Sequence, residues 1–291
     1  MRSLGEFITH VCAAVVKRFD GDIDSGILFV ALLRQADLGG TGAATPISFN
    51  ALSRSLARPF ETVRRLCNRL CDLGLAERND QGIFVPRKAL ELAIAREIRT
   101  EIHDNFVRMI VDQVALGYPL PLQQDKPMDR HAIELGAIDL LLFSFEFGVP
   151  AHPMQDWQRP YLYLTLMTAN ARPYTFDREL AWRYSDITTP PADEHRMPVG
   201  ASALARAIGI PYTTVRRNLK GMVAEGRLIH AEGSGYLINM AWMQSPTSAA
   251  SGVNMVVQLD RVLRQVAAAG FPFDDPAIAY REGPPVFLDF R

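Results

Sequence analysis

The feature that most constrains this chain is a basic heptad that occurs twice. Residues 59–65 read PFETVRR, and residues 211–217, which lie 152 positions later, read PYTTVRR. The similarity extends upstream, because LSRSLARPFETVRR (52–65) and LARAIGIPYTTVRR (204–217) are identical at seven of fourteen positions. A local repeat of this kind predicts that one structural unit occurs twice in the chain.

Each copy predicts a short helix, a tight turn and a second helix that ends at a glycine. Pro59 interrupts the first helix, because the residue before a proline avoids helical angles, and proline is well tolerated in the first turn of the next helix. We expect this second helix from about residue 59 to 73, ending at Gly74. Two short extended runs around a polar turn then predict a β-hairpin. The second copy repeats the plan, with Gly226 as the stop and a hairpin turn that is one residue longer.

This order of elements resembles the winged helix-turn-helix family of bacterial transcriptional regulators. The resemblance rests on ISFNALSRSLARPFETVRRLCNRLCDLGLAERNDQGIFV (47–85) and VGASALARAIGIPYTTVRRNLKGMVAEGRLIHAEGSGYLI (199–238). Members of the family also have a helix before each copy, for which residues 24–38 and 160–171 are the candidates. The resemblance implies a protein that binds double-stranded DNA.

The family places the second helix of each pair, the recognition helix, in the major groove of DNA. Arginine can bond guanine bidentately, threonine can contact a thymine methyl group, and glutamate can accept from cytosine. Arg54 and Arg206 lie on the preceding helices, where phosphate contacts fix the register. The wings offer Arg78 and His230. The remaining candidate DNA-binding residues, all on the two recognition helices, are Glu61, Thr62, Arg64, Arg65, Asn68, Arg69, Thr213, Thr214, Arg216, Arg217 and Lys220.

A different class of function stays open. Charged residues on the outer face of a helix are ordinarily only solvated, and winged helices also bind protein partners in scaffold or chromosome-associated assemblies. The two TVRR segments favour DNA, because the same residue types recur at equivalent positions. The formal net charge of −1 favours the scaffold alternative, since any nucleic-acid surface then has to be a local patch.

Composition and motifs narrow the remaining possibilities. With 291 residues the chain is long enough for about two domains. Three cysteines are too few for a disulfide framework and indicate a reducing compartment; a structural role suits Cys67 and Cys71 best, with redox sensing as the alternative. We expect no signal peptide and no membrane span, hence a cytoplasmic location. No supported nucleophile–base pair or metal cluster is visible, so we expect no catalytic residue, metal or cofactor, and not an enzyme.

The expected fold is mainly α, with tandem winged helix-turn-helix domains and small β-hairpin wings joined by a helical middle region. Helices are expected at residues 86–117, 131–147 and 253–269. The aromatic residues Phe143, Phe145, Phe147, Trp157, Tyr161 and Tyr163 are more typical of a core than of an effector pocket. The role of the 172–199 insertion, any small-molecule effector and self-association stay open. The predicted boundaries are 1–86 for the first domain, 87–156 for the connector, 157–244 for the second domain and 245–291 for a C-terminal helix and tail.

Overall fold

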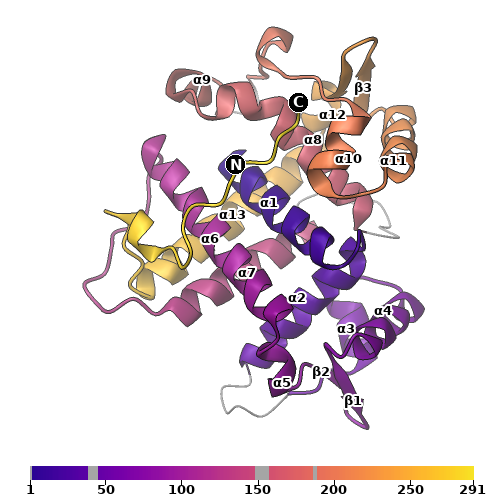
Figure 1. Cartoon of the computed structure of the whole chain (residues 1–291). Helices are drawn as coiled ribbons and strands as arrows, with labels where there is room; N and C mark the ends of the chain where they lie inside the picture. The colour runs from indigo at the N-terminus through magenta and orange to yellow at the C-terminus, as the bar shows by residue number, and fades with distance from the viewer. Residues whose placement is uncertain (1, 39–44, 148–156, 186–188) are drawn as a thin grey trace.

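The computed structural model describes residues 2–38, 45–147, 157–185 and 189–291 (Figure 1). Within these ranges the chain forms thirteen α-helices and two small antiparallel β-hairpins, which confirms the mainly helical prediction. Residues 148–156, at the end of the expected connector, and part of the 172–199 insertion lie outside the described residues.

The first half of the chain builds the following series of elements: α1 (Arg2–Arg18), α2 (Ile23–Leu38), α3 (Phe49–Ser55), α4 (Phe60–Asp72), β1 (Glu77–Asn79), β2 (Gly82–Phe84), α5 (Arg87–Leu90) and α6 (Ala93–Ala115). The Ser48 hydroxyl caps α3 by accepting from the backbone N–H of Ala51. Pro59 occupies the N-cap position of α4, one residue before the first turn in which the sequence predicts it.

The second half follows the same order with an addition: α7 (Arg130–Phe147), α8 (Gln158–Thr175), α9 (Arg178–Arg183), the 3₁₀ turn η1 (Asp193–His195), α10 (Ala201–Ile208), α11 (Tyr212–Ala224), β3 (Leu228–Ala231), β4 (Gly235–Ile238), α12 (Met240–Met243), α13 (Pro246–Ala268) and η2 (Pro276–Ala279). Helix α9 and η1 lie in the 172–199 insertion; they and η2 have no counterpart among the described residues of the first half.

The hairpins are held to their own halves in the same way. Ile47 forms an isolated antiparallel bridge to Ile83, and Val199 forms the matching bridge to Tyr236. At Gly235 (φ +126°) an added Cβ would come within 2.6 Å of the Val199 carbonyl oxygen, and at Gly82 the clash with Ile47 would be closer still. A glycine is therefore needed where each hairpin passes the strand-like segment before α3 or α10.

The repeat is longer than the sequence comparison indicates. The predicted single helix over residues 86–117 is wrong: Leu92 has extended backbone angles (φ −67°, ψ 148°) and separates the one-turn α5 from the long α6. Ser245 separates α12 from α13 in the same manner. Helix α13 consequently begins at Pro246, earlier than the predicted residue 253. Both long helices end at a left-handed glycine, in GYPL (117–120) and GFPF (270–273).

The first helix of each half packs against both halves. Helix α1 packs against α6 of its own half and against α8 of the other, while α7 packs against α13 of its own half and against α2 of the other (Figure 1). Since α1 corresponds to α7 and α2 to α8 in chain order, these contacts are reciprocal, as in a twofold homodimer. One continuous hydrophobic core runs through both halves.

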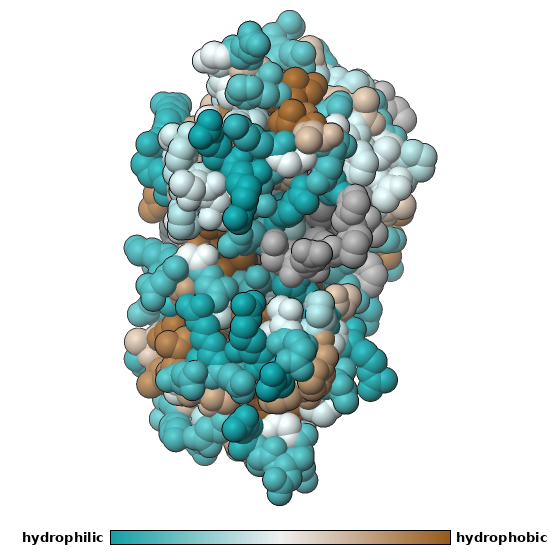
Figure 2. Space-filling model, turned by 90° about the vertical axis from the view of Figure 1, so that its right-hand side faces the viewer, coloured by the Kyte–Doolittle hydropathy of each residue, from teal (hydrophilic) through white to brown (hydrophobic). Residues whose placement is uncertain are grey.

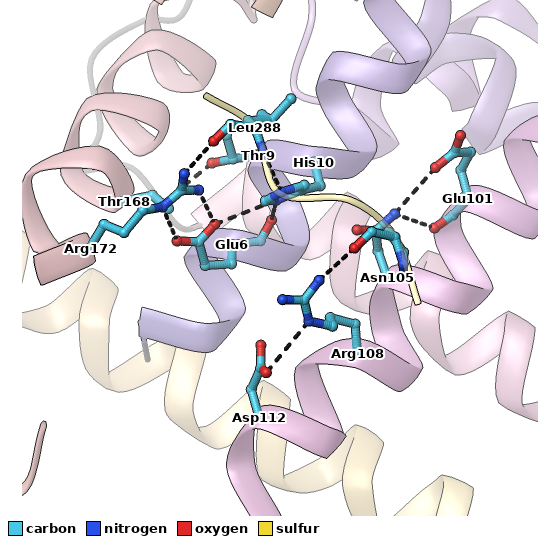
Figure 3. Close-up of polar contacts among 11 residues, drawn as sticks. Glu6, Thr9, His10, Glu101, Asn105, Arg108, Asp112, Thr168, Arg172 and Leu288 are labelled. Atoms are coloured by element: carbon cyan, nitrogen blue, oxygen red, sulfur yellow. Dashed lines mark hydrogen bonds and ion pairs between the residues drawn. The ribbon is translucent and has the colours of Figure 1, made fainter. Parts of the chain in front are cut away.

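Buried polar contacts add to this junction (Figure 3). Glu6 of α1 accepts two hydrogen bonds from Arg172 of α8, at 3.0 and 2.7 Å. Burial raises the pKa of Glu6, and the positive charge of Arg172 opposes this rise. The C-terminal tail crosses the same place, where the Leu288 backbone N–H donates to Nε2 of His10 at 3.0 Å. Phe290 of the tail is buried, so the tail docks onto the body of the protein.

Candidate nucleic-acid interface

Helix α4 presents its basic residues to solvent because its apolar residues face α2. Val63, Leu66, Cys67 and Leu70 are buried along the inner side of the helix. The outer side, together with the end of α3 and the first hairpin, is called the α4 face. It comprises the exposed Arg54, Glu61, Arg64, Arg65, Arg69 and Arg78 and the half-buried Thr62 and Asn68. The structure thus brings the candidate residues of α4 together on one side of the helix, with Arg78 of the hairpin donating to Asn68 at 3.5 Å, and Arg54 lies on the preceding helix α3.

Some arginines of the α4 face are engaged within the protein. Arg64 donates to Glu61 at 2.9 Å, one turn earlier on the same helix. Arg69 forms an ion pair with Asp22, at 2.5 Å, in the turn between α1 and α2. Sequence reasoning did not find Asp22, because it lies 47 positions from its partner and no local pattern indicates the contact. Arg65 is exposed and has no hydrogen-bond or ion-pair partner among the described residues.

The second copy forms an equivalent surface, called the α11 face. It comprises the exposed Arg206, Thr213, Arg216, Arg217, Lys220 and His230 and the half-buried Thr214. Val215, Leu219 and Met222 are buried on the opposite side of α11. The helix itself contains no acidic residue, and Glu225, which follows it, is paired with Arg159 and Arg227.

One residue of the α11 face is hydrogen-bonded to the C-terminal tail. Arg206 donates to the backbone carbonyl of Arg291 in the C-terminal tail. Arg216, Arg217 and Lys220 have no hydrogen-bond or ion-pair partner within the described ranges of the chain. The two faces carry the same formal charge, because the α4 face has five arginines and one glutamate and the α11 face has three arginines and one lysine.

Both faces lie on the same side of the molecule. Helices α4 and α11, with the hairpins beside them, stand one below the other along the right-hand edge of Figure 1. Figure 2 looks onto that side and shows mainly hydrophilic residues over its upper and lower parts, with hydrophobic ones in smaller groups. Although the net charge of the chain is near zero, two local basic surfaces thus lie on one side of the molecule.

Comparison with protein-family models, with curated proteins and with solved structures finds no match to this chain. The function of the two faces is therefore inferred from the chemistry of their residues.

Other types of site find little support in the described residues. No group of three or more His, Cys, Asp or Glu side chains is placed there to hold a metal ion. Burial raises the pKa of Cys67 to about 12 and also raises that of Cys71, so both remain thiols near neutral pH, which disfavours redox sensing. None of the described helices is long and apolar enough to cross a membrane.

The expected aromatic cluster is divided between different environments. Tyr161 is fully buried in the core. Phe143, Phe145 and Trp157 line a cavity of about 390 Å³ that α2, α3, α7 and α13 enclose. Tyr163 lines a second cavity, near α1 and α13. The side chain of Phe147 lies outside the described residues.

Proposed function

We propose that each half of the molecule carries a winged helix-turn-helix domain and that the protein is a cytoplasmic transcriptional regulator that binds duplex DNA. One observation carries the proposal: the basic residues of TVRR recur at equivalent, exposed positions of α4 and α11, on one side of the molecule. A purely structural repeat would require only the buried residues of each helix to recur.

The proposed contacts follow from the position of each side chain. Arg65 and Arg217 are exposed and have no internal partner among the described residues, so they are free to reach base edges. Arg54, one helix earlier, is placed for a phosphate, as is Arg206 once it leaves the Arg291 carbonyl. Arg78 belongs to a wing that lies beside its recognition helix.

The two faces are expected to prefer different sequences. Glu61 on the α4 face corresponds to Thr213 on the α11 face, and Asn68 corresponds to Lys220. Glutamate can accept a hydrogen bond from cytosine and asparagine can bond adenine, whereas threonine and lysine make neither contact in the same way. The binding site is therefore proposed to consist of two unlike half-sites.

Selection from random duplex DNA, followed by affinity measurement over a range of salt concentrations, tests the proposal. Release of counterions makes the logarithm of the affinity fall roughly linearly with the logarithm of the salt concentration. We expect an enriched sequence and a steep salt dependence. Absence of binding to every duplex at low salt would reject the DNA-binding proposal.

A protein-binding scaffold is the second candidate. The side chain of Phe60 is 40% exposed and that of Tyr212 is 46% exposed, and each lies at the start of one of the two recognition helices. Exposed aromatic residues are common at protein interfaces. Capture of a protein partner that depends on Phe60 and Tyr212, together with failure of the DNA selection, would favour this candidate.

A further inference from the structure

A mostly apolar cavity of about 220 Å³ lies at the junction of the two halves, between α1, α8, α12 and α13. Much of its lining is methionine and leucine or isoleucine, including Leu4, Ile8, Met167, Met240, Met243 and Met255. Methionine side chains are flexible and polarizable, so a wall of this composition can adapt its shape to a bound molecule. Residues 189–191 complete one side.

Arg2 brings a positive charge to this apolar wall. Its Nη1 donates to the Tyr184 carbonyl at 2.7 Å, and its Nη2 donates to the Ala181 carbonyl. The Nε atom is buried and has no partner among the described residues. The described lining includes no carboxylate, and residues 186–188, which separate two lining residues, lie outside the described part of the chain. Arg2 itself is half-buried, and an anionic group in the cavity would pair with its guanidinium in a charge-assisted hydrogen bond.

Tyr163 supplies a second polar group in the lining. Its side chain is almost wholly buried, at 3% exposed. The hydroxyl has no hydrogen-bond partner of normal geometry within the described parts of the chain, and Ser248 and Trp242 are the polar side chains beside it. Burial also raises the pKa of Tyr163 to about 12, so the hydroxyl keeps its proton and can donate. Buried hydroxyl groups ordinarily have a partner, and an acceptor on a bound molecule would provide one.

We propose that this cavity binds a small organic carboxylate, with its anionic group bonded to Arg2 and its apolar body against the methionines. Its size sets the scale of the ligand: a 150 Å³ apolar cavity holds benzene, so 220 Å³ corresponds to roughly nine non-hydrogen atoms. Benzoate and hexanoate are probes of that size and charge.

A molecule bound in the cavity can influence the α11 face through the helices that line the cavity. Helix α8 packs directly against α11, and α12 and α13 follow the second hairpin in the chain. A ligand that fills the space between these helices fixes how α11 sits relative to α1 and hence to the first half. The carboxylate would then act as an effector of DNA binding; this regulatory step rests on the proposed function, whereas binding of the carboxylate does not.

Calorimetric titration of the full-length protein with benzoate and with hexanoate tests the binding site. We expect saturable binding of at least one probe, and binding of the neutral benzyl alcohol at least about tenfold weaker, since hydrogen bonds to charged groups contribute that much. Failure of both carboxylates to bind saturably, or equal binding of benzyl alcohol, would overturn the proposal.

Two variants of α13 separate filling of the cavity from a general effect of substitution. Gly252 lines the cavity, and a Cβ added there would meet nothing within 4 Å, so Gly252→Leu fills the space without a backbone clash. Ala250 is exposed on the same helix, which makes Ala250→Leu the matched control. We expect the first variant to lose carboxylate binding and the second to bind as the unmodified protein does. Unchanged binding by Gly252→Leu would place the ligand elsewhere.

The role of the charge is tested with Arg2→Gln. This variant should lose the preference for benzoate over benzyl alcohol, a ratio that a merely loosened fold would not change selectively. Tyr163→Phe, which removes only the unpartnered hydroxyl, should fold normally and bind benzoate several-fold more weakly. A retained preference for benzoate in Arg2→Gln would contradict the assignment of the anion to Arg2.

The effector role has a separate readout. The affinity for the selected DNA duplex should change in the presence of a carboxylate that binds, and should not change in Gly252→Leu. Carboxylate binding without any effect on DNA affinity would reject regulation alone, and carboxylate binding by a protein that binds no DNA would reject the proposed function alone.

Discussion

His10 is a buried histidine whose two ring nitrogens both have defined partners (Figure 3). Because the Leu288 N–H donates to Nε2, that nitrogen carries no proton, and Nδ1 donates to the Glu6 carbonyl at 2.7 Å. The pKa of His10 is lowered to about 4, mainly by burial and also by the nearby charges of Arg172 and Arg108, against the opposing effect of the backbone hydrogen bond. The Glu6 carboxylate faces the ring at 3.5 Å. The contact with the tail thus requires a neutral imidazole.

This arrangement predicts how stability depends on pH. Between pH 6.5 and about 4 the unfolded chain binds a proton at His10 that the folded chain does not, so the stabilisation is present above pH 6.5 and is lost as the pH falls towards 4. Relative to His10→Gln, the free energy of unfolding should fall by about 3 kcal/mol over this interval. Denaturant titrations at several pH values measure it. Parallel profiles for the two proteins would contradict the prediction, because Glu6 titrates in both.

Arg65 and Arg217, which have no internal partner among the described residues, lead to a separate prediction. If Arg65 and Arg217 read bases, Arg65→Ala or Arg217→Ala should each cost about 1–3 kcal/mol of DNA affinity and relax the preference in one half-site only. Arg183, an exposed residue of α9 away from both faces, supplies the control substitution. Competition binding against duplexes altered in one half-site gives the answer. Uniform weakening on all sequences would indicate phosphate contacts instead.

At the scale of elements, the turn before each recognition helix differs between the halves in one informative residue. The chain passes through a left-handed conformation at Ala57 (φ +50°) in the first half and at Gly209 (φ +70°) in the second. A left-handed conformation costs an alanine about 1–2 kcal/mol, whereas a glycine adopts it without strain but loses more entropy on folding.

Exchanging these residues should change stability in opposite directions. We expect Ala57→Gly to raise the free energy of unfolding by about 0.5–1 kcal/mol and Gly209→Ala to lower it by about 1 kcal/mol. The Cβ added at Gly209 would meet only the Val16 side chain, at 3.6 Å, so backbone conformation dominates the effect. Chemical denaturation of both variants checks the signs. A destabilised Ala57→Gly protein would show that strain at Ala57 is negligible.

For the whole molecule, the packing of α1 and α7 against both halves predicts one fixed distance between the α4 face and the α11 face. The contacts of α1 with α8 and of α7 with α2, together with the Glu6–Arg172 ion pair, join the halves through a continuous core. Two modules held in this way bind the second half-site as an intramolecular event, which can raise affinity by about 10²–10⁴.

Insertion of base pairs between the half-sites tests the fixed distance. About 5 bp should rotate one half-site to the opposite side of the duplex and abolish the added affinity, and about 10 bp should restore part of it. The full-length chain is needed, because a protein that ended near residue 82 would lack α6, against which α1 packs. If the inserted DNA binds as tightly as the original, the two faces do not engage DNA together.

The sequence by itself determined the elements whose causes are local. Pro59 precedes the first residue of α4, glycines follow the ends of α4 and α11, and the apolar spacing turns the arginines of TVRR outward, because each of these effects acts within a few residues. The break at Leu92 and the equivalence of α5–α6 with α12–α13 were missed, since those segments share a backbone path but few side chains. Only the tertiary structure decided that α1 packs on the opposite half, that Asp22 meets Arg69, and that Arg2 and Tyr163 line one cavity. These contacts join residues far apart in the chain, and the packing of the whole core selects them.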